Sequence, residues 1–393
     1  MTRNNRLIMF ALFLWGVGEG TWFFIRSLYL EQLGATPEEV GVVLSFAALT
    51  VAASFLPGGL LVDRLDRKHV MIAGWLSGVF APLLMALATD WRSFLIGFSL
   101  YNLSAFVIPA INAYVSQASG GAPLERIFPI VYAGFSIGSI LGPQVSRALL
   151  AVIDVRGVLI VSSALFATST LAVSFIDPQP ASRRVLPNGS PSLRASIGGA
   201  LRPALAFYLS LFAIIFAMAI GIQLIPNYLG RLGWRMADVS GIGSAQAIGV
   251  TILSVAIGHL SAGRGRRGLL LAQGLVCVAM ASFAFGVPAW SGFAAAGYFL
   301  LGGYQTARQQ AAAQVVSYVP PEYQGTGFAL AETVGALGLA AASLISGVLF
   351  AIEPARPFHV ALLLIPFGAL LTLRLRRPRM IEARRVEAVM SDT

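Results

Sequence analysis

Residues 58–68 have the sequence GGLLVDRLDRK and form a short charged segment between two long apolar runs. Residues 258–268, GHLSAGRGRRG, occupy the corresponding position between two later apolar runs. A shift of 200 residues aligns the two segments, and the identical residues that it superposes include Gly58 and Gly258, Arg64 and Arg264, Arg67 and Arg267, Phe128 and Phe328, and Gly138 and Gly338. The sequence therefore predicts two halves that repeat in the same order along the chain.

Twelve apolar segments are long enough to cross a bilayer, which takes about 20 apolar residues per helix. Bounded by charged residues, Pro or Gly, they lie near residues 7–33, 39–62, 69–89, 93–117, 127–150, 157–176, 203–229, 237–261, 268–288, 291–318, 325–351 and 357–374. We therefore predict an all-α membrane protein in which twelve transmembrane helices form two pseudo-symmetric bundles of six.

A polar stretch at residues 177–202 separates the sixth and seventh apolar segments. It is rich in Pro, Ser and Arg and has no apolar periodicity, which is typical of a linker. The predicted division is an N-terminal bundle at 1–176, a cytoplasmic linker at 177–202, a C-terminal bundle at 203–376 and a cytoplasmic tail at 377–393. The first apolar segment lacks a small-residue cleavage site, so we expect a transmembrane helix there and not a cleaved signal.

The composition excludes a soluble protein. Hydrophobic residues make up 57% of the chain and charged residues only 11%, and the mean hydropathy is +0.78. A soluble domain has roughly 25% charged residues. The net charge of +10 would suggest a nucleic-acid partner in a soluble protein. Here the arginines flank apolar segments, so the predicted partner is the lipid bilayer and not nucleic acid.

No metal, cofactor or catalytic site is expected from the sequence. Cys277 is the only cysteine, which excludes a disulfide framework and a cysteine metal site. His69, His259 and His359 are far apart, and none has a second ligand at metal spacing. There is no Walker phosphate-binding loop and no nucleophile with a neighbouring base, so the sequence disfavours an ATP-driven pump and an intramembrane enzyme.

The distribution of positive residues predicts the orientation in the membrane. With the N-terminus inside, 19 of the 27 Lys and Arg residues fall in cytoplasmic segments and six on the opposite side, while Arg26 and Arg308 fall inside predicted helices. Cytoplasmic loops carry the excess of positive residues. We therefore expect a multi-pass protein of the cell inner membrane with both termini in the cytoplasm.

The charged segment at 58–68 resembles the cytoplasmic loop motif between helices 2 and 3 of the major facilitator superfamily, G-x-L-a-D-r-x-G-r-[RK]. The residues that match are Gly59, Asp63, Arg64, Arg67 and Lys68. Asp66 stands where the family usually has glycine, and the second copy has Gly263 in place of the first Asp. A carboxylate at a helix end can pair with arginines across the cytoplasmic face, so we expect a conformational latch here. The alternative is that these arginines only anchor the topology.

A second match lies in the predicted fifth helix, where residues 134–143 have the sequence GFSIGSILGP. Gly134, Gly138 and Gly142 lie four residues apart and allow tight helix packing, and Pro143 kinks the helix. The segment resembles motif C of the family, which is associated with exporters that exchange substrate for protons. The glycine pair that usually follows the proline is absent.

Glu19 is the clearest candidate for a proton-carrying group. It lies about 18 Å along the first helix at ~1.5 Å per residue, near the bilayer centre, and an ionisable residue at that depth is a functional-site hypothesis. Trp15, Glu19, Trp22 and Arg26 share one helical face, which we expect to line the central cavity. The alternative is a hydrogen-bonded glutamate that ties helices together.

In the second half, Arg308 of helix 10 and Glu332 of helix 11 lie at similar depths and could form a pair. The pair is a fixed structural contact, a site at which Arg308 binds an anionic substrate group, or a pair that exchanges as Glu332 takes up a proton. Resemblance to the superfamily places helices 1, 4, 7 and 10 around the cavity. The further polar candidates on these helices, each of which could instead join helices, are Tyr101, Asn102, Asn112, Gln223, Asn227, Gln305 and Gln309.

These features predict a secondary active transporter that moves a small organic solute by alternating access, coupled to protons through Glu19 and Glu332. The helix 5 motif favours efflux by antiport, although helix 4 lacks the intramembrane arginine of drug–proton antiporters. The alternatives are uptake of a sugar, organic anion or lipid-like solute by symport or uniport, and a non-transporting membrane sensor. We expect the protein to act as a monomer.

Overall fold

The computed structural model describes most of the 393 residues. The described ranges are 1–120, 123–179, 193–261, 265–287, 290–320 and 323–375, without the side chains of 55–64, 125, 193–194 and 265. Every regular element in these ranges is a helix, which confirms the predicted all-α fold.

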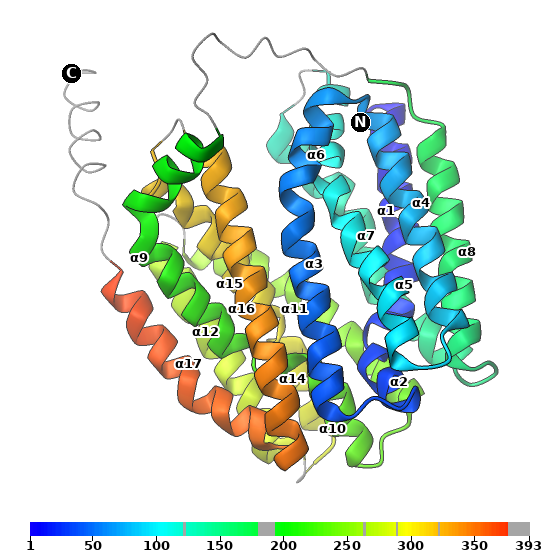
Figure 1. The fold of residues 1–393 in the computed structure, drawn as a ribbon, viewed down its shortest axis with the longest axis vertical. Helices are drawn as coiled ribbons and strands as arrows, with labels where there is room; N and C mark the ends of the chain where they lie inside the picture. The colour runs from blue at the N-terminus through cyan, green and yellow to red at the C-terminus, as the bar shows by residue number, and fades with distance from the viewer. Residues whose placement is uncertain (121–122, 180–192, 262–264, 288–289, 321–322, 376–393) are drawn as a thin grey trace.

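The helices form two groups that follow one another along the chain (Figure 1). The first half consists of α1 (Arg3–Phe23), α2 (Arg26–Gln32), α3 (Pro37–Arg64), α4 (Arg67–Leu87), α5 (Trp91–Leu103), η1 (Ser104–Val107), α6 (Ile108–Ala118), α7 (Leu124–Leu149) and α8 (Val155–Ser174). The second half consists of α9 (Leu193–Ala219), η2 (Ile222–Leu224), α10 (Ile225–Arg231), α11 (Met236–Leu260), α12 (Gly265–Ala281), a π-helical turn η3 (Ser282–Gly286), α14 (Gly292–Leu300), α15 (Gly302–Gln314), η4 (Val315–Ser317), α16 (Gln324–Ile352) and α17 (Arg356–Arg374). The helix α9 thus begins inside the predicted linker.

Within the described ranges, ten helical segments are long and apolar enough to cross a membrane, and eleven if the bent pair α1–α2 is one span. The predicted tenth helix, 291–318, is outside this set for two reasons. It is broken at Leu301, between α14 and α15, and α15 carries Gln305, Arg308 and Gln309, which lower its hydropathy. With this segment, each half has six spans. The polar side chains that weaken the apolar pattern are the residues that sequence reasoning assigned to a site.

Four predicted helices are interrupted, and they are helices 1, 4, 7 and 10. The α1–α2 pair bends by 43°, and η1, η2 and Leu301 interrupt the others. The sequence analysis placed these spans but did not indicate the breaks within them. Side chains satisfy backbone groups at two of these breaks: the Arg26 guanidinium donates to the Phe23 carbonyl, and the Gly221 N–H donates to Ser346 Oγ at 2.8 Å. Non-helical backbone is tolerated at membrane depth where it is buried in protein or lines a cavity.

The two halves lie side by side and approach most closely at the lower end of Figure 1, near α2 and α10, while the upper ends of α3 and α16 diverge. At the lower end, Asn227 Nδ2 donates to the Ser27 carbonyl at 3.0 Å, and Arg231 forms an ion pair with Glu31 at 3.2 Å. Both pairs are separated by 200 residues, the offset of the sequence repeat. Residues that meet their own repeat equivalents lie next to a pseudo-two-fold axis, as in parallel-repeat transporters.

Helices α1 and α7 pack backbone against backbone. A methyl group added at Gly134, Gly138 or Gly142 would lie 2.2, 2.2 and 2.5 Å from carbonyl oxygens of α1. On the other side of the contact, a methyl group at Gly16 would lie 2.4 Å from the Phe135 carbonyl oxygen. Small residues permit this approach, and dispersion contacts between the two backbones stabilise it.

Gly138→Ala should therefore destabilise the protein by about 1–3 kcal/mol, the usual cost of overpacking, because the added methyl group must push α1 away from α7. Thermal unfolding of the purified protein in detergent measures the effect. Gly274→Ala on α12 is the matched control, since nothing lies within 4 Å of its added methyl group. Equal unfolding temperatures for the two variants would contradict this account of the α1–α7 contact.

Candidate functional site

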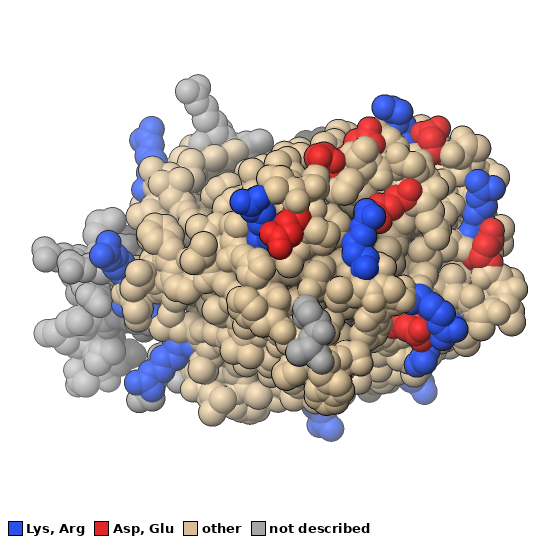
Figure 2. Space-filling model, turned by 90° about the horizontal axis from the view of Figure 1, so that it is seen from below, with Lys and Arg blue, Asp and Glu red and all other residues tan. Residues whose placement is uncertain are grey.

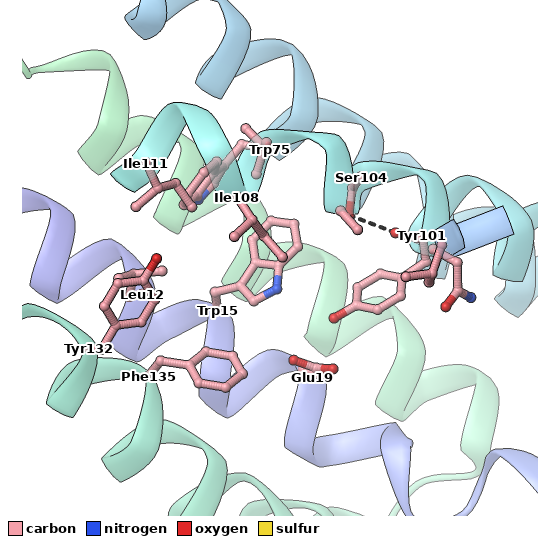
Figure 3. A pocket seen from close by; sticks show the side chains of 14 residues that line it. Leu12, Trp15, Glu19, Trp75, Tyr101, Ser104, Ile108, Ile111, Tyr132 and Phe135 are labelled. Atoms are coloured by element: carbon pink, nitrogen blue, oxygen red, sulfur yellow. Dashed lines mark hydrogen bonds between the residues drawn. The ribbon is translucent and has the colours of Figure 1, made fainter. Parts of the chain in front are cut away.

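A cavity of about 350 Å³ lies inside the first half, between α1, α5, η1, α6 and α7 (Figure 3). Its wall is mostly aromatic and aliphatic, and Glu19 of α1 is the one carboxyl group among the described residues that line it. The Glu19 side chain interacts with the Tyr101 hydroxyl, which points toward it in Figure 3, and lies in the field of the Arg26 charge. Among the described residues, the cavity thus combines a mostly apolar wall with a single carboxyl group.

Aromatic packing holds the wall of this cavity in place. The Trp15 ring stacks on Phe166 with centroids 4.3 Å apart and meets Trp75 edge-on at 5.3 Å. The indole fits against α4 because Gly78 has no side chain: a methyl group there would lie 2.0 Å from the Trp15 ring. Trp75 donates to Ser169 Oγ at 2.7 Å, which fixes the second indole. Such a wall suits the flat apolar part of an organic molecule.

A second cavity of about 110 Å³ lies between the two halves. It brings together four side chains that the sequence singled out: Arg26 of α2, Gln223 of η2, and Gln305 and Arg308 of α15. Arg26 Nη2 donates to Gln223 Oε1 at 3.0 Å, and Gln223 Nε2 donates to Ser343 Oγ at 2.6 Å. The arginine of the first half is therefore bonded to the second half.

The predicted pair of Arg308 and Glu332 is present. Arg308 Nη2 lies 2.5 Å from Glu332 Oε2, and the two side chains are 25% and 36% exposed. Removal of one partner from a fully buried pair costs about 3–5 kcal/mol. The partial exposure of both groups lowers that cost here. Arg308 also lines the second cavity, so the pair holds an arginine at its edge.

The face predicted for helix 1 is divided between three environments. Trp15 and Glu19 line the first cavity and Arg26 lines the second, but Trp22 is 1% exposed and packs against the Tyr101 ring at 4.8 Å. The break after Phe23 turns the chain, so the helical stripe does not continue along one face.

The remaining polar candidates have separate positions. Tyr101 and Asn102 line the first cavity. Asn112 accepts a hydrogen bond from the Tyr132 hydroxyl at 2.6 Å, and Gln309 is exposed on α15. Asn227 is 1% exposed and joins α10 to α2, so it ties the halves together and lines neither cavity.

Several lining residues were not found from the sequence. In the first cavity these are Trp75, Tyr132 and Phe135, and in the second they are Ser27, Gln246, Tyr298 and Tyr304. Aromatic residues in an apolar helix carry no signal of their own. Tyr298 and Tyr304 lie on the predicted tenth helix, which the resemblance to the superfamily placed beside the cavity. That placement could have indicated both tyrosines as lining residues.

Part of the predicted latch lies outside what the structure describes. Gly59, Asp63 and Arg64 belong to the stretch 55–64, of which only the backbone is described. Arg67 hydrogen-bonds to the Gln117 amide oxygen and, at 3.4 Å, to Gln179 Oε1, so it joins the end of α6 to the segment after α8. Lys68 follows Asp66, the N-cap of α4, whose carboxylate accepts from the Lys68 N–H at 2.9 Å. Asp66, which stands where the family usually has glycine, thus caps the N-terminus of α4.

The contacts that join the halves gather at the end where α2 and α10 lie, and Figure 2 looks onto that end, where acidic and basic side chains lie next to one another. Asp238 forms ion pairs with Arg147 of the other half at 3.2 Å and with Arg235 at 3.0 Å. Gln144 Nε2 donates to the Gly241 carbonyl at 2.7 Å and contacts Ser244 Oγ at 3.0 Å. Among the described residues, all side-chain hydrogen bonds between the halves belong to this region.

Two helical bundles of six spans each, with one cavity inside the first bundle and a second cavity between the two, define a polytopic helical membrane protein. The family model of the Major Facilitator Superfamily matches residues 7–343, so the chain belongs to this superfamily. The solved structure of the nucleoside transporter NupG is similar over 95% of this chain and 98% of its own, with a TM-score of 0.75 and 15% sequence identity, and this likeness shows the fold alone.

Two curated relatives bear names that refer to function. A Deinococcus radiodurans protein whose name proposes sugar efflux is 28% identical over 198 residues, which are 49% of this chain and 50% of that protein. The quinolone resistance protein NorA of Staphylococcus aureus is 23% identical over 146 residues, 37% of this chain and 38% of NorA. The matches thus span about half the length of these relatives or less.

We call the end where α2 and α10 lie the joined end. Separation of the two halves there should depend more on Gln144 than on Asp238. The Asp238 pairs are surface pairs worth at most about 1 kcal/mol, so Asp238→Asn should raise the open population by up to about fivefold. Gln144→Leu removes two hydrogen bonds worth about 1 kcal/mol each, which corresponds to about thirtyfold. The rate at which an impermeant thiol reagent, added on the α2–α3 side, labels Ser27→Cys in a Cys277→Ser background measures this population.

Labelling rates that stay at the parent value in both variants would show that these contacts do not hold the end closed. Arg356→Gln provides the control for a lost surface charge, because Arg356 is exposed at the start of α17 and forms no ion pair with the described residues of the first half.

Proposed function

We propose that the protein is a secondary active transporter of a small organic solute, coupled to protons through Glu19. The observation that carries this proposal is the position of Glu19: a lone carboxyl group in the aromatic cavity of the first half, on the interrupted helix that also carries Arg26. A titratable group that lines a substrate-sized cavity can link proton binding to solute binding.

The volume and lining of the first cavity support a small organic solute. Ligand pockets occupy about 300–1,000 Å³ and are mostly apolar with a few placed polar groups, and the Glu19 cavity has about 350 Å³. Transport leaves the bonds of the solute unchanged, so the proposal includes no enzymatic activity, and a membrane sensor without transport is disfavoured by the family.

The distribution of contacts between the halves supports alternating access. The halves are joined at one end by hydrogen bonds and ion pairs that can break and re-form, and their other ends diverge in Figure 1. In the proposed orientation both termini are cytoplasmic, in the inner membrane, and the divergent end faces the cytoplasm. The same proposal includes a monomeric state and a division of the chain into an N-terminal bundle at 1–176, a linker at 177–202, a C-terminal bundle at 203–376 and a tail at 377–393.

Two directions of transport have support. Export by proton antiport is favoured by the glycine–proline segment of α7 and by the relatives named for sugar efflux and quinolone resistance. Uptake of an organic anion by proton symport is the second candidate, because Arg26 lies in the field of Glu19. Glu332, which is paired with Arg308, is the second proposed proton site.

Glu19→Gln should abolish coupled proton movement. In proteoliposomes that enclose a pH-sensitive dye, sugars and quinolones are added one at a time to find a compound that moves protons with the wild-type protein. With that compound, the Glu19→Gln signal should fall to that of protein-free liposomes, while exchange of labelled solute without a gradient persists, because the amide fills the same space but cannot release a proton.

Glu39→Gln is the matched control, since Glu39 lies at the start of α3 and pairs loosely with Arg92 at 3.9 Å. Full proton coupling in Glu19→Gln would contradict the assignment. Loss of exchange as well as coupling would indicate that Glu19 is required for binding or folding and not for proton coupling alone.

A further inference from the structure

The cavity between the halves is unusually rich in hydrogen-bond donors. Arg26 reaches it from α2 and Arg308 from α15, so each half contributes one guanidinium group. No Asp or Glu is present among the described residues that line it. In the described part of the chain, the one carboxylate bonded to either arginine is Glu332, which pairs with Arg308 and is not among the lining residues.

Arg26 is an interior cation without a carboxylate partner. Its Nη1 and Nη2 groups donate to a carbonyl and an amide oxygen, and its Nε–H has no partner. Across the described part of the chain, no carboxylate oxygen lies within 4.0 Å of its guanidinium nitrogens. The guanidinium stacks over the Phe23 ring at 3.8 Å, which fixes its position. A cation inside the helical bundle that no carboxylate contacts directly requires a functional explanation.

Three buried hydroxyl groups border the same cavity and have no hydrogen-bond partner among the described residues. They belong to Ser27, Tyr298 and Tyr304, which are 1%, 2% and 6% exposed. A buried hydroxyl without a partner is unfavourable, and such groups are rare in native proteins. With Arg26 Nε, the described residues that line this one small cavity therefore carry four buried donor groups without an acceptor.

The size of the space indicates what the acceptor is. A volume of about 110 Å³ exceeds the ~30 Å³ share of one water molecule and is well below the ~300 Å³ of a complete ligand pocket. It is therefore large enough for a charged head group and too small for the body of an organic molecule. Arginine forks match the oxygen atoms of carboxylates and phosphates.

We propose that Arg26, Arg308 and the hydroxyl groups of Ser27, Tyr298 and Tyr304 form an oxyanion subsite between the two halves, which binds the carboxylate or phosphate group of a small organic anion. The inference rests on the proposed function, because it names the class of solute, and it favours the symport direction. A ligand held by one arginine from each half also links the halves directly.

The test is binding to the purified full-length protein in detergent, where no gradient exists. Benzoate, phenyl phosphate and the uncharged benzamide are the probes, and thermal unfolding at constant ionic strength reports binding. Benzoate or phenyl phosphate should raise the unfolding temperature in a saturable way, and benzamide should not; the comparison of the two anions tells which oxyanion group the subsite prefers. Arg26→Gln should weaken anion binding by about tenfold or more, as expected for one lost charge-assisted hydrogen bond.

Two further variants make the test robust to misfolding. Tyr298→Phe removes only the hydroxyl and keeps the ring packing against Phe283, and it should weaken anion binding in the same direction. Arg356→Gln, which removes an exposed arginine at the start of α17, should leave anion binding unchanged. Equal stabilisation by benzamide, no stabilisation by either anion, or wild-type affinity in both Arg26→Gln and Tyr298→Phe would overturn the proposal. Because the Glu19→Gln test measures proton movement and this test measures binding, one can fail while the other succeeds.

Discussion

The close approach of α1 and α7 is the contact on which the rest of the first half depends. Glycines on both helices let carbonyl oxygens of one helix lie where a methyl group of the other would be, and no larger residue fits. This contact sets the position of Glu19, because Glu19 lies on α1 between Gly16 and Gly20, which both face α7. The site is thus positioned by backbone packing, which is stiffer than contact through long side chains.

The internal repeat has a structural consequence beyond similar halves. At the joined end, Ser27 meets Asn227 and Glu31 meets Arg231, each pair separated by the repeat offset of 200 residues. A symmetric bundle would place two like residues opposite each other on the axis. Here the repeats have diverged, so that Glu31 faces Arg231 as anion and cation and the Asn227 side chain donates to the backbone carbonyl of Ser27. Divergence between the copies therefore supplies the charge complementarity of the Glu31–Arg231 pair.

The sequence predicted the fold well because membrane crossing has one dominant requirement, about 20 apolar residues per helix. The sequence did not indicate the breaks in helices 1, 4, 7 and 10. Apolar periodicity does not show where a side chain such as Arg26 or Ser346 will satisfy freed backbone groups. For the site, ionisable residues inside helices were conspicuous, and Glu19, Arg26 and Arg308 all border described cavities. Trp22 was misplaced and Tyr298 was missed, because the facing of an aromatic side chain depends on tertiary packing.

The proximity of Glu19 and Arg26 decides the sign of coupling once the charge of the solute is known. Ionised Glu19 partly neutralises the field of Arg26, and a protonated Glu19 leaves that field uncompensated. An anion at Arg26 therefore binds more tightly when Glu19 holds a proton, and by reciprocity the anion favours proton uptake. Positive linkage of this kind carries proton and solute together, which is symport. A cationic solute in the aromatic cavity would instead compete with the proton for Glu19, which is the negative linkage that antiport requires. The direction of transport thus depends on which of the two cavities holds the charged group of the solute.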